Sequence, residues 1–167
     1  MTPDFSKALS AVFLSGLAEE FPVTSKVIAA IPNQKLDYRP DAKSKTALEL
    51  AWHLAATDAW FLDCIAALTF ELTPPEQPAT VTTGTEMAVW YDQAIAERLP
   101  KLNLLSPEQW ATPVNFYGIF QHPLALYLQF MSNHMVHHRG QLSTYLRAMG
   151  GKCPSIYGGS ADEPMEA

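Results

Sequence analysis

Two histidines in the C-terminal half of the chain have the spacing of a metal-binding pair. His134 and His138 are four residues apart, and in a helix this spacing places both rings on one face, about 6 Å apart along the axis. Two neutral imidazoles in this arrangement can bind one metal ion. The same spacing also arises by chance in a chain with five histidines, and such a pair can form a solvated patch. The pair alone therefore leaves both interpretations open.

A third histidine lies in the most apolar segment of the sequence. His53 is flanked by tryptophan, leucine and alanine residues, among which a lone imidazole would leave its ring nitrogens without hydrogen bonds. In one interpretation its partner is a backbone carbonyl or Glu49. In the other, His53 shares a metal ion with His134 and His138, which gives three neutral nitrogen ligands and an open coordination position.

The other two histidines fit a metal site less well. His137 offers an alternative spacing of three residues with His134, but helical phase places His138 nearer the apolar stripe of its helix. His122 precedes a proline and is expected in a loop or a helix cap. Met135 stands where the zincin proteases place a glutamate base, so the motif is not that of a zincin.

Four helices are predicted to position these residues. Apolar side chains recur every three or four residues over 4–31, 46–69, 85–99 and 123–149. Thr46 and Glu49 form a capping-box signature at the start of the second helix. Pro22 is expected to kink or interrupt the first helix, Pro100 to end the third, and Pro123 to lie in the first turn of the last.

The connecting segments complete the predicted fold. Residues 72–84 contain three prolines and no helical period, which predicts a crossover loop. Residues 101–121 are expected to be irregular, with a short strand over 114–120. The sequence thus predicts an all-α four-helix bundle with long crossover connections, formed by a single domain over 1–155. An acidic, loosely held tail is predicted over 156–167.

Composition restricts the class of partner. The 167 residues are 48% hydrophobic, enough for one buried core, and only 17% charged, which favours an apolar contact with a second subunit. Lys and Arg number 11 against 17 Asp and Glu, with no basic cluster seen in the sequence, so no nucleic-acid partner is expected.

The sequence also predicts a cytoplasmic protein with no membrane partner. No apolar run approaches the roughly 20 residues that span a bilayer, and charged residues interrupt the first twenty positions, where a signal peptide would be apolar. Cys64 and Cys153 match neither a disulfide framework nor a paired-cysteine zinc motif, and are expected to be reduced thiols.

Two segments of the chain resemble the DinB/YfiT-like superfamily. One is Asn133–Gly150, which contains the specific run His-x-x-x-His-His-Arg-Gly-Gln, and the other is Glu49–Asp58, about eighty positions earlier. The order of elements is similar over nearly the whole chain. The similarity includes the turn Tyr38–Pro40 before the second helix and the segment Pro154–Tyr157 after the last.

The resemblance implies a four-helix bundle, usually homodimeric, that holds one divalent metal ion near one end. Its ligands would be one histidine of the second helix and two of the last, which correspond here to His53, His134 and His138. The resemblance thus favours His138 over His137. Three imidazoles with a water suit zinc or nickel foremost, and iron or copper also.

The implied chemistry is that of a Lewis acid. Three neutral histidines leave the charge of a metal largely uncompensated, so it can lower the pKa of a bound water or thiol and polarise a substrate oxygen. The family includes transferases that use bacterial low-molecular-weight thiols, and a maleylpyruvate isomerase. The resemblance therefore implies a metal-dependent enzyme of the thiol-dependent transferase or hydrolase type, with a low-molecular-weight thiol and a small electrophilic substrate as partners. The alternative is a non-catalytic metal-binding bundle with a structural or stress-response role.

Helical phase gives candidates for the wall of a substrate pocket, each of which could equally be plain core packing. They are Thr57, Trp60, Tyr127, Met131, Gln141 and Tyr145.

Other polar residues near the histidines have predicted supporting roles. Glu49 or Asp58 could orient His53 by accepting a hydrogen bond from its second nitrogen. Arg139 points about 100° away from the neighbouring ligand and is expected to pair with an acid elsewhere or with a second subunit. Cys64 is three turns from His53, too far to bind the same ion, and is expected to be a small buried hydrophobe.

Overall fold

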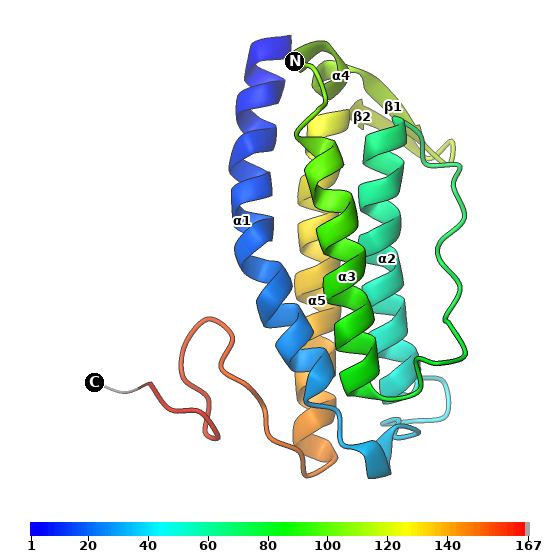
Figure 1. The fold of residues 1–167 in the computed structure, drawn as a ribbon, viewed down its shortest axis with the longest axis vertical. Helices are drawn as coiled ribbons and strands as arrows, with labels where there is room; N and C mark the ends of the chain where they lie inside the picture. Colours follow the sequence, from blue (N-terminus) through cyan, green and yellow to red (C-terminus); the bar gives the residue numbers. More distant parts are fainter. Residues whose placement is uncertain (166–167) are drawn as a thin grey trace.

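The computed structural model describes residues 1–165, most of which lie in helices (Figure 1). The long helices are α1 (Pro3–Ala29), α2 (Ala47–Ala67), α3 (Gly84–Leu102) and α5 (Tyr127–Ala148). The short elements are the helix α4 (Pro107–Ala111), the 3-10 turns η1 (Asn33–Lys35) and η2 (Leu124–Leu126), and the strands β1 (Pro113–Phe116) and β2 (Phe120–Pro123). The four predicted helices correspond to the long ones, whereas the small sheet corrects the all-α expectation.

The long helices lie side by side (Figure 1). α1 and α5 run in one direction, and α2 and α3 run in the opposite direction. Because α2 and α3 are parallel, the chain between them must return along the length of the molecule, and residues 68–83 do so on its outside. The crossover loop predicted over 72–84 lies in this segment.

Local sequence signals set where the helices begin. The predicted capping box of α2 is present: Glu49 N–H donates to Thr46 Oγ1 at 3.1 Å, and Thr46 N–H donates to Glu49 Oε2 at 2.7 Å. Thr83 forms a second capping box at α3. A third, at Ser106, opens α4, a helix that sequence reasoning missed although Ser-Pro-Glu-Gln carries the same signature.

Of three prolines, Pro22 agrees with the sequence-based expectation of a kink, whereas Pro100 and Pro123 act differently. Pro22 lies within a continuous α1, which bends partway along its length (Figure 1). Pro100 does not end α3, which continues to Leu102. The reason is that proline in a last turn removes only one backbone donor, while the additional turn buries Leu102 completely. Pro123 ends β2, and α5 starts only after η2.

A β-hairpin occupies the end of the segment that was expected to be irregular. β1 and β2 are antiparallel, with register from Pro113 opposite Pro123 to Phe116 opposite Phe120. Tyr117 and Gly118 have φ angles of 52° and 74° in the turn, which is why a glycine stands there. The single strand predicted over 114–120 is therefore two short strands joined by this turn.

The hydrophobic core surrounds α2. This helix buries residues on every side, including Leu54, Ala55 and Ile65, as its apolar sequence predicts. It packs against α3 and α5, so that a polar side chain on α2 can reach solvent only where these neighbours leave a gap. None of the helices within residues 1–165 is long and apolar enough to cross a membrane.

Ion pairs connect the described part of the acidic tail to the long helices. Glu163 pairs with Lys26 of α1 at 2.6 Å, and Asp162 pairs with Arg147 of α5 at 2.7 Å. The last two residues of the predicted tail lie outside the described residues. The boundary of the single domain at residue 155 stays a prediction.

Gly84 allows α1 and α3 to approach closely, and its replacement by alanine is expected to destabilise the protein by about 1–2 kcal/mol. A Cβ atom at this position would lie 2.6 Å from the backbone oxygen of Ile28. Urea unfolding would measure the change. Gly140→Ala is the matched control, because a Cβ in this helical position meets nothing within 4 Å, and alanine there should stabilise by about 0.5–1 kcal/mol. Equal effects of the two substitutions would contradict the prediction.

Candidate metal centre

Three imidazole rings from two helices converge at one point. His53 of α2 faces His134 and His138 of α5, and one ring nitrogen of each lies within 4.8 Å of the others. The Nε2 atom of His53 is 3.2 Å from Nε2 of His134 and 3.2 Å from Nε2 of His138. This group could hold a metal ion, as the sequence predicted for the same three residues.

The local fold explains why the rings meet. His134 and His138 are one turn apart on α5, and the helical period therefore gives both the same direction. α2 packs along α5, and His53 of α2 faces the two rings of α5 across this contact. All three side chains are partly buried, with one side of the group left open to solvent.

The geometry of the nitrogens fits a bound cation. Two nitrogens that are each 2.0–2.1 Å from one tetrahedral ion are about 3.3 Å apart, close to the two separations of 3.2 Å found here. The Nδ1 atom of His134 is buried without a hydrogen-bond partner. This nitrogen is not the one that faces the other two rings, so the fit to a cation rests on the separations of the Nε2 atoms.

Two polar side chains orient the outer nitrogens of the rings. Gln141 Oε1 lies 3.1 Å from Nδ1 of His138, and Thr57 Oγ1 lies 3.5 Å from Nδ1 of His53. When the Nδ1 atom of His138 donates a hydrogen bond to Gln141, the Nε2 atom of His138 is unprotonated. The lone pair of this Nε2 atom is then directed at the other two rings. Hydrogen bonding at the back of the rings therefore prepares their Nε2 atoms to bind a metal.

The two carboxylates expected behind His53 do not perform this role. Glu49 Oε2 accepts a hydrogen bond from the N–H of Thr46 in the capping box at the start of α2. Asp58 is fully buried and accepts a hydrogen bond of 2.7 Å from Tyr91 of α3. Thr57, which sequence reasoning placed in the pocket wall, is the residue that reaches the ring.

Burial keeps the three rings in the neutral form that binds metals. Burial, together with the neighbouring His138, His53 and His137, lowers the pKa of His134 to about 3. Burial also lowers the pKa of His53, with contributions from His138 and Lys45, and burial lowers that of His138 against the opposing effect of Gln141. Neutral imidazole is the ligand form, so these shifts favour metal binding near neutral pH.

The remaining candidates lie apart from the cluster. The ring of His137 is exposed and packs against that of His138, with centroids 4.7 Å apart, but does not join the converging nitrogens. His122 lies in β2 and packs near Phe120. Cys64 is buried as expected, and burial raises the pKa of its thiol to about 12, which makes it a poor nucleophile.

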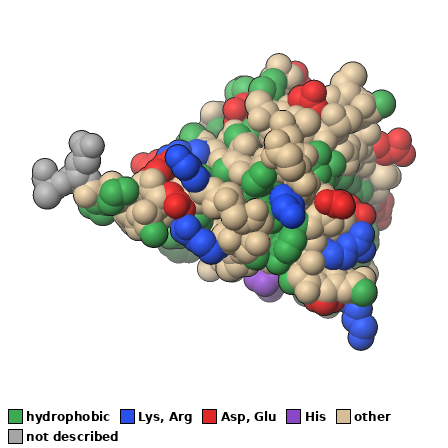
Figure 2. All heavy atoms as spheres, turned by 90° about the horizontal axis from the view of Figure 1, so that it is seen from below, with side chains coloured by type: hydrophobic (Ala, Val, Ile, Leu, Met, Phe, Trp, Pro, Cys, Tyr) green, Lys and Arg blue, Asp and Glu red, His purple; other side chains and the backbone are tan. Residues whose placement is uncertain are grey.

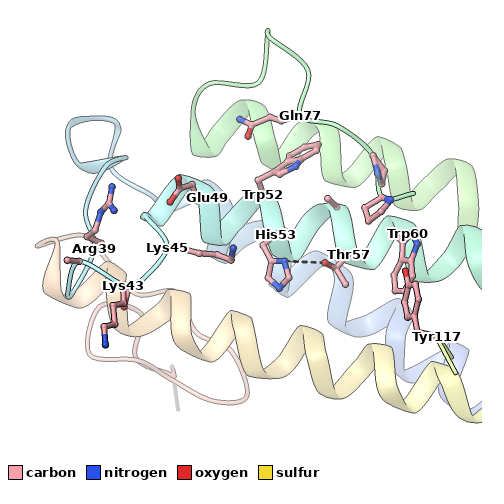
Figure 3. A pocket seen from close by; sticks show the side chains of 15 residues that line it. Arg39, Lys43, Lys45, Glu49, Trp52, His53, Thr57, Trp60, Gln77 and Tyr117 are labelled. Atoms are coloured by element: carbon pink, nitrogen blue, oxygen red, sulfur yellow. Dashed lines mark hydrogen bonds between the residues drawn. The ribbon is translucent and has the colours of Figure 1, made fainter. Parts of the chain in front are cut away.

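A cavity of about 640 Å³ opens beside His53 (Figure 3). Charged side chains line one end of it and aromatic side chains the other, with His53 and Thr57 between them (Figure 3). Its lining includes Arg39, Lys43, Lys45, Glu49, Trp52, Trp60 and Tyr117. Its volume is that of a site for a small organic molecule.

The structure separates the six predicted wall residues into two groups. Thr57 and Trp60 line the cavity, and Gln141 bonds to His138. The other three, Tyr127, Met131 and Tyr145, are buried in the core instead. The reason is that other elements cover α5 on several sides. The position of a residue around the helix, counted from His134, therefore does not show whether its side chain faces a pocket or the core.

Sequence reasoning missed the cationic end of the cavity. Arg39, Lys43 and Lys45 lie in the connection before α2, where Asp41 and a proline separate them in the sequence. The irregular loop gathers all three at one place, which corrects the expectation that the chain has no basic cluster. From the end of the molecule seen in Figure 2, Lys and Arg side chains are mixed with acids, so they form no extended basic surface.

Arg139, the neighbour of His138, has the acidic partner that the sequence predicted. It is buried and pairs with Glu20 of α1. Its guanidinium also donates to Thr24 Oγ1 at 3.2 Å and to the hydroxyl of Tyr157. Arg139 therefore joins α5 to α1 and to the C-terminal segment, and it points away from the three rings.

Replacing Asp58 by asparagine is expected to remove one source of pH dependence from folding stability. Burial raises the pKa of this carboxyl from 3.8 to about 8. The unfolded chain loses the proton near pH 4 and the folded chain only near pH 8, so this group makes the folded protein less stable as pH rises between these values. Urea unfolding of both proteins at about pH 4 and about pH 8 would show the variant gaining stability relative to the wild type at the higher pH. A difference that is the same at both pH values would contradict the prediction.

Comparison with known proteins gives consistent results. A model of the DinB family matches residues 5–166. The uncharacterized protein YrdA of Bacillus subtilis (strain 168) is 28% identical over 156 residues, which cover 90% of this chain and 89% of YrdA.

Two solved structures have a similar fold. A DinB-like protein from Bacillus cereus ATCC 10987 has a TM-score of 0.73 at 24% identity, over 87% of this chain and 95% of that one. The DinB-like protein YjoA from Bacillus subtilis has a TM-score of 0.71 at 23% identity, over 86% and 96% of the two chains. At these identities the likeness concerns the fold.

Proposed function

Since the chain belongs to the DinB family, we propose that it is a metal-dependent enzyme of that family, with His53, His134 and His138 as the ligands of one divalent ion. The observation that carries this proposal is the convergence of three Nε2 atoms beside a cavity of about 640 Å³. A site that only stapled α2 to α5 would need no cavity of this kind.

When bound, a divalent metal would supply a Lewis acid that lowers the pKa of a water or thiol and polarises a substrate oxygen. The protein would hold it with three neutral rings, which leave most of its charge in place. Gln141 and Thr57 fix two of these rings from behind. Zinc and nickel suit this ligand set foremost, and iron or copper also suit it.

The chain's own residues would bind and orient the substrate. The aromatic side chains of Trp52 and Trp60 give the cavity apolar walls that exclude water, and His53 lies between Trp60 and the charged end. A substrate in this cavity would therefore have its reacting group next to His53, the one of the three rings that lines it. We propose a thiol-dependent transfer or a hydrolysis, with a low-molecular-weight thiol and a small electrophile as the reactants.

We also propose the helix arrangement, the oligomeric state and the cellular location that the sequence predicted. The long helices would form a four-helix bundle of the DinB type, and two copies would associate as a homodimer in the cytoplasm. A low share of charged residues, 17%, favours such an association.

Cobalt(II) provides a direct test, because its visible absorption reports coordination. Protein loaded with one equivalent of cobalt should show absorption typical of a tetrahedral site, and a small thiol such as cysteine should change this absorption and add a near-ultraviolet band. His134→Ala protein treated with the same cobalt and thiol serves as the control. A cobalt spectrum that neither thiol nor azide alters would show a closed site, which overturns the enzymatic proposal in favour of a structural metal.

A further inference from the structure

We infer that the cavity beside the three histidines binds an organic acid, and that Lys45 is the positioning residue for its anionic group. This inference rests on the proposed function, which it deepens by naming a substrate class. The expected ligand has an anionic group next to the histidines and an apolar, flat portion that lies against the aromatic wall. Its support comes from the charges, the aromatic contacts and the direction of the Lys45 side chain.

The charged end of the cavity has an excess of positive charge. Arg39, Lys43 and Lys45 line it, and Glu49 is the acid among the lining residues. The whole chain carries a net charge of −6, so the protein as a whole repels anions. A local group of three cations at a cavity would attract an anionic ligand in spite of this net charge.

The nearby acids are occupied by other partners. Asp41 accepts hydrogen bonds from Ser44 Oγ at 2.7 Å and from the N–H of Lys43 at 2.8 Å, and Glu49 Oε2 accepts from the N–H of Thr46 at 2.7 Å. Within residues 1–165, none of the three cations of the cavity takes part in an ion pair. Their charges are therefore available to a ligand.

Lys45 is the cation nearest to the histidines. Its side chain points toward His53 (Figure 3). The positive charge of Lys45 also lowers the pKa values of His53 and His138. For both rings, burial and other neighbouring residues have larger effects than Lys45. The backbone oxygen of Lys45 accepts from the hydroxyl of Tyr145 of α5 at 3.4 Å, which ties this residue to the helix of the other two rings. An anion placed between Lys45 and the rings would contact an ammonium on one side and a divalent ion on the other.

Aromatic side chains line the rest of the cavity. The indole N–H of Trp60 donates to the backbone oxygen of Leu72 at 2.7 Å, which fixes the ring. Tyr117 of the hairpin stacks on Trp60, with centroids 6.2 Å apart and an interplanar angle of 13°. Trp52, above His53 in Figure 3, is packed against Trp90 with centroids 4.6 Å apart. Such a wall favours an aromatic or flat apolar group.

A matched pair of ligands tests the inference. The probes are 3-phenylpropionate and its neutral amide, titrated into zinc-loaded protein and followed by tryptophan fluorescence, because Trp52 and Trp60 line the cavity. The acid should bind more tightly than the amide. Lys45→Met should weaken binding of the acid about tenfold and leave that of the amide unchanged, since it removes a charge but keeps the length of the side chain. Lys45→Arg should restore most of the affinity for the acid.

Two controls separate charge from packing. Lys35→Met removes the same charge from η1 outside the cavity and should not change either affinity. Tyr117→Asn, which suits the positive φ of 52°, should weaken acid and amide equally. Equal affinities of the wild type for acid and amide, or an unchanged affinity of Lys45→Met for the acid, would overturn the inference.

The proposed function can fail separately. If the wild type takes up no zinc, the proposal of a metal centre is wrong, and the same titrations in zinc-free protein still decide whether Lys45 binds the anion. If zinc binds and Lys45→Met retains full affinity for the acid, the metal centre stands and the inference about Lys45 is wrong.

Discussion

Replacing His134 by alanine is expected to abolish stoichiometric metal binding. The purified wild type should contain or take up close to one equivalent of a divalent metal per chain, and the variant almost none. Loss of one of three imidazoles leaves two ligands, and even residues that only support a ligand affect metal affinity by 10- to 100-fold. We therefore expect the affinity to fall by more than about 100-fold. Elemental analysis and competition with a chelator, on protein without an affinity tag, would measure this change.

The neighbouring His137 supplies the control for this prediction. It is on the same helix and beside His138, but its exposed ring is not among the converging nitrogens. His137→Ala should therefore keep its metal, whereas His53→Ala and His138→Ala should lose it as His134→Ala does. A circular dichroism spectrum equal to that of the wild type would show that each variant is folded. Metal content unchanged in all three ligand variants would show that the three rings do not form the site.

The sequence predicted which histidines meet through two regular features together with a family resemblance. The spacing of four between His134 and His138 fixes their common face. His53 stands in a helix so apolar that the residue needed an external partner. Both arguments use only the helical period and burial, which local sequence encodes. The resemblance to the DinB family then selected His138 over His137, as the convergence of the rings also does.

The cavity wall could not be predicted in the same way, because irregular segments build much of it. Lys45 and Arg39 come from a loop whose path depends on turns and caps, and Tyr117 comes from a hairpin with strands of four residues each. Runs of this length carry little periodicity. Tyr127 and Met131 were assigned to the wall because helical phase gives the direction in which a side chain points. Phase does not show which elements cover that side of the helix in the folded protein, where both residues are buried.

Arg139 points away from the three histidines, as predicted, and its replacement by methionine is expected to cost about 2–3 kcal/mol of unfolding free energy. The guanidinium is almost fully buried and pairs with Glu20, whose side chain is 21% exposed. Removal of one partner of a buried pair costs about 3–5 kcal/mol, and the partial exposure of Glu20 reduces this figure. Urea unfolding at neutral pH would measure the loss. The C-terminal segment should also become more sensitive to protease, because Tyr157 loses its bond to Arg139.

Two comparisons distinguish a buried pair from an exposed one. Arg147→Met removes the same charge from the same helix, where the side chain is 52% exposed and pairs with Asp162, and should cost less than about 1 kcal/mol. Adding Glu20→Gln to Arg139→Met should recover about 1 kcal/mol, because the carboxylate would no longer be left without its cation. If Arg139→Met and Arg147→Met had the same effect, the buried pair would contribute no more than a surface pair, and α1 and α5 would be joined here by apolar packing alone.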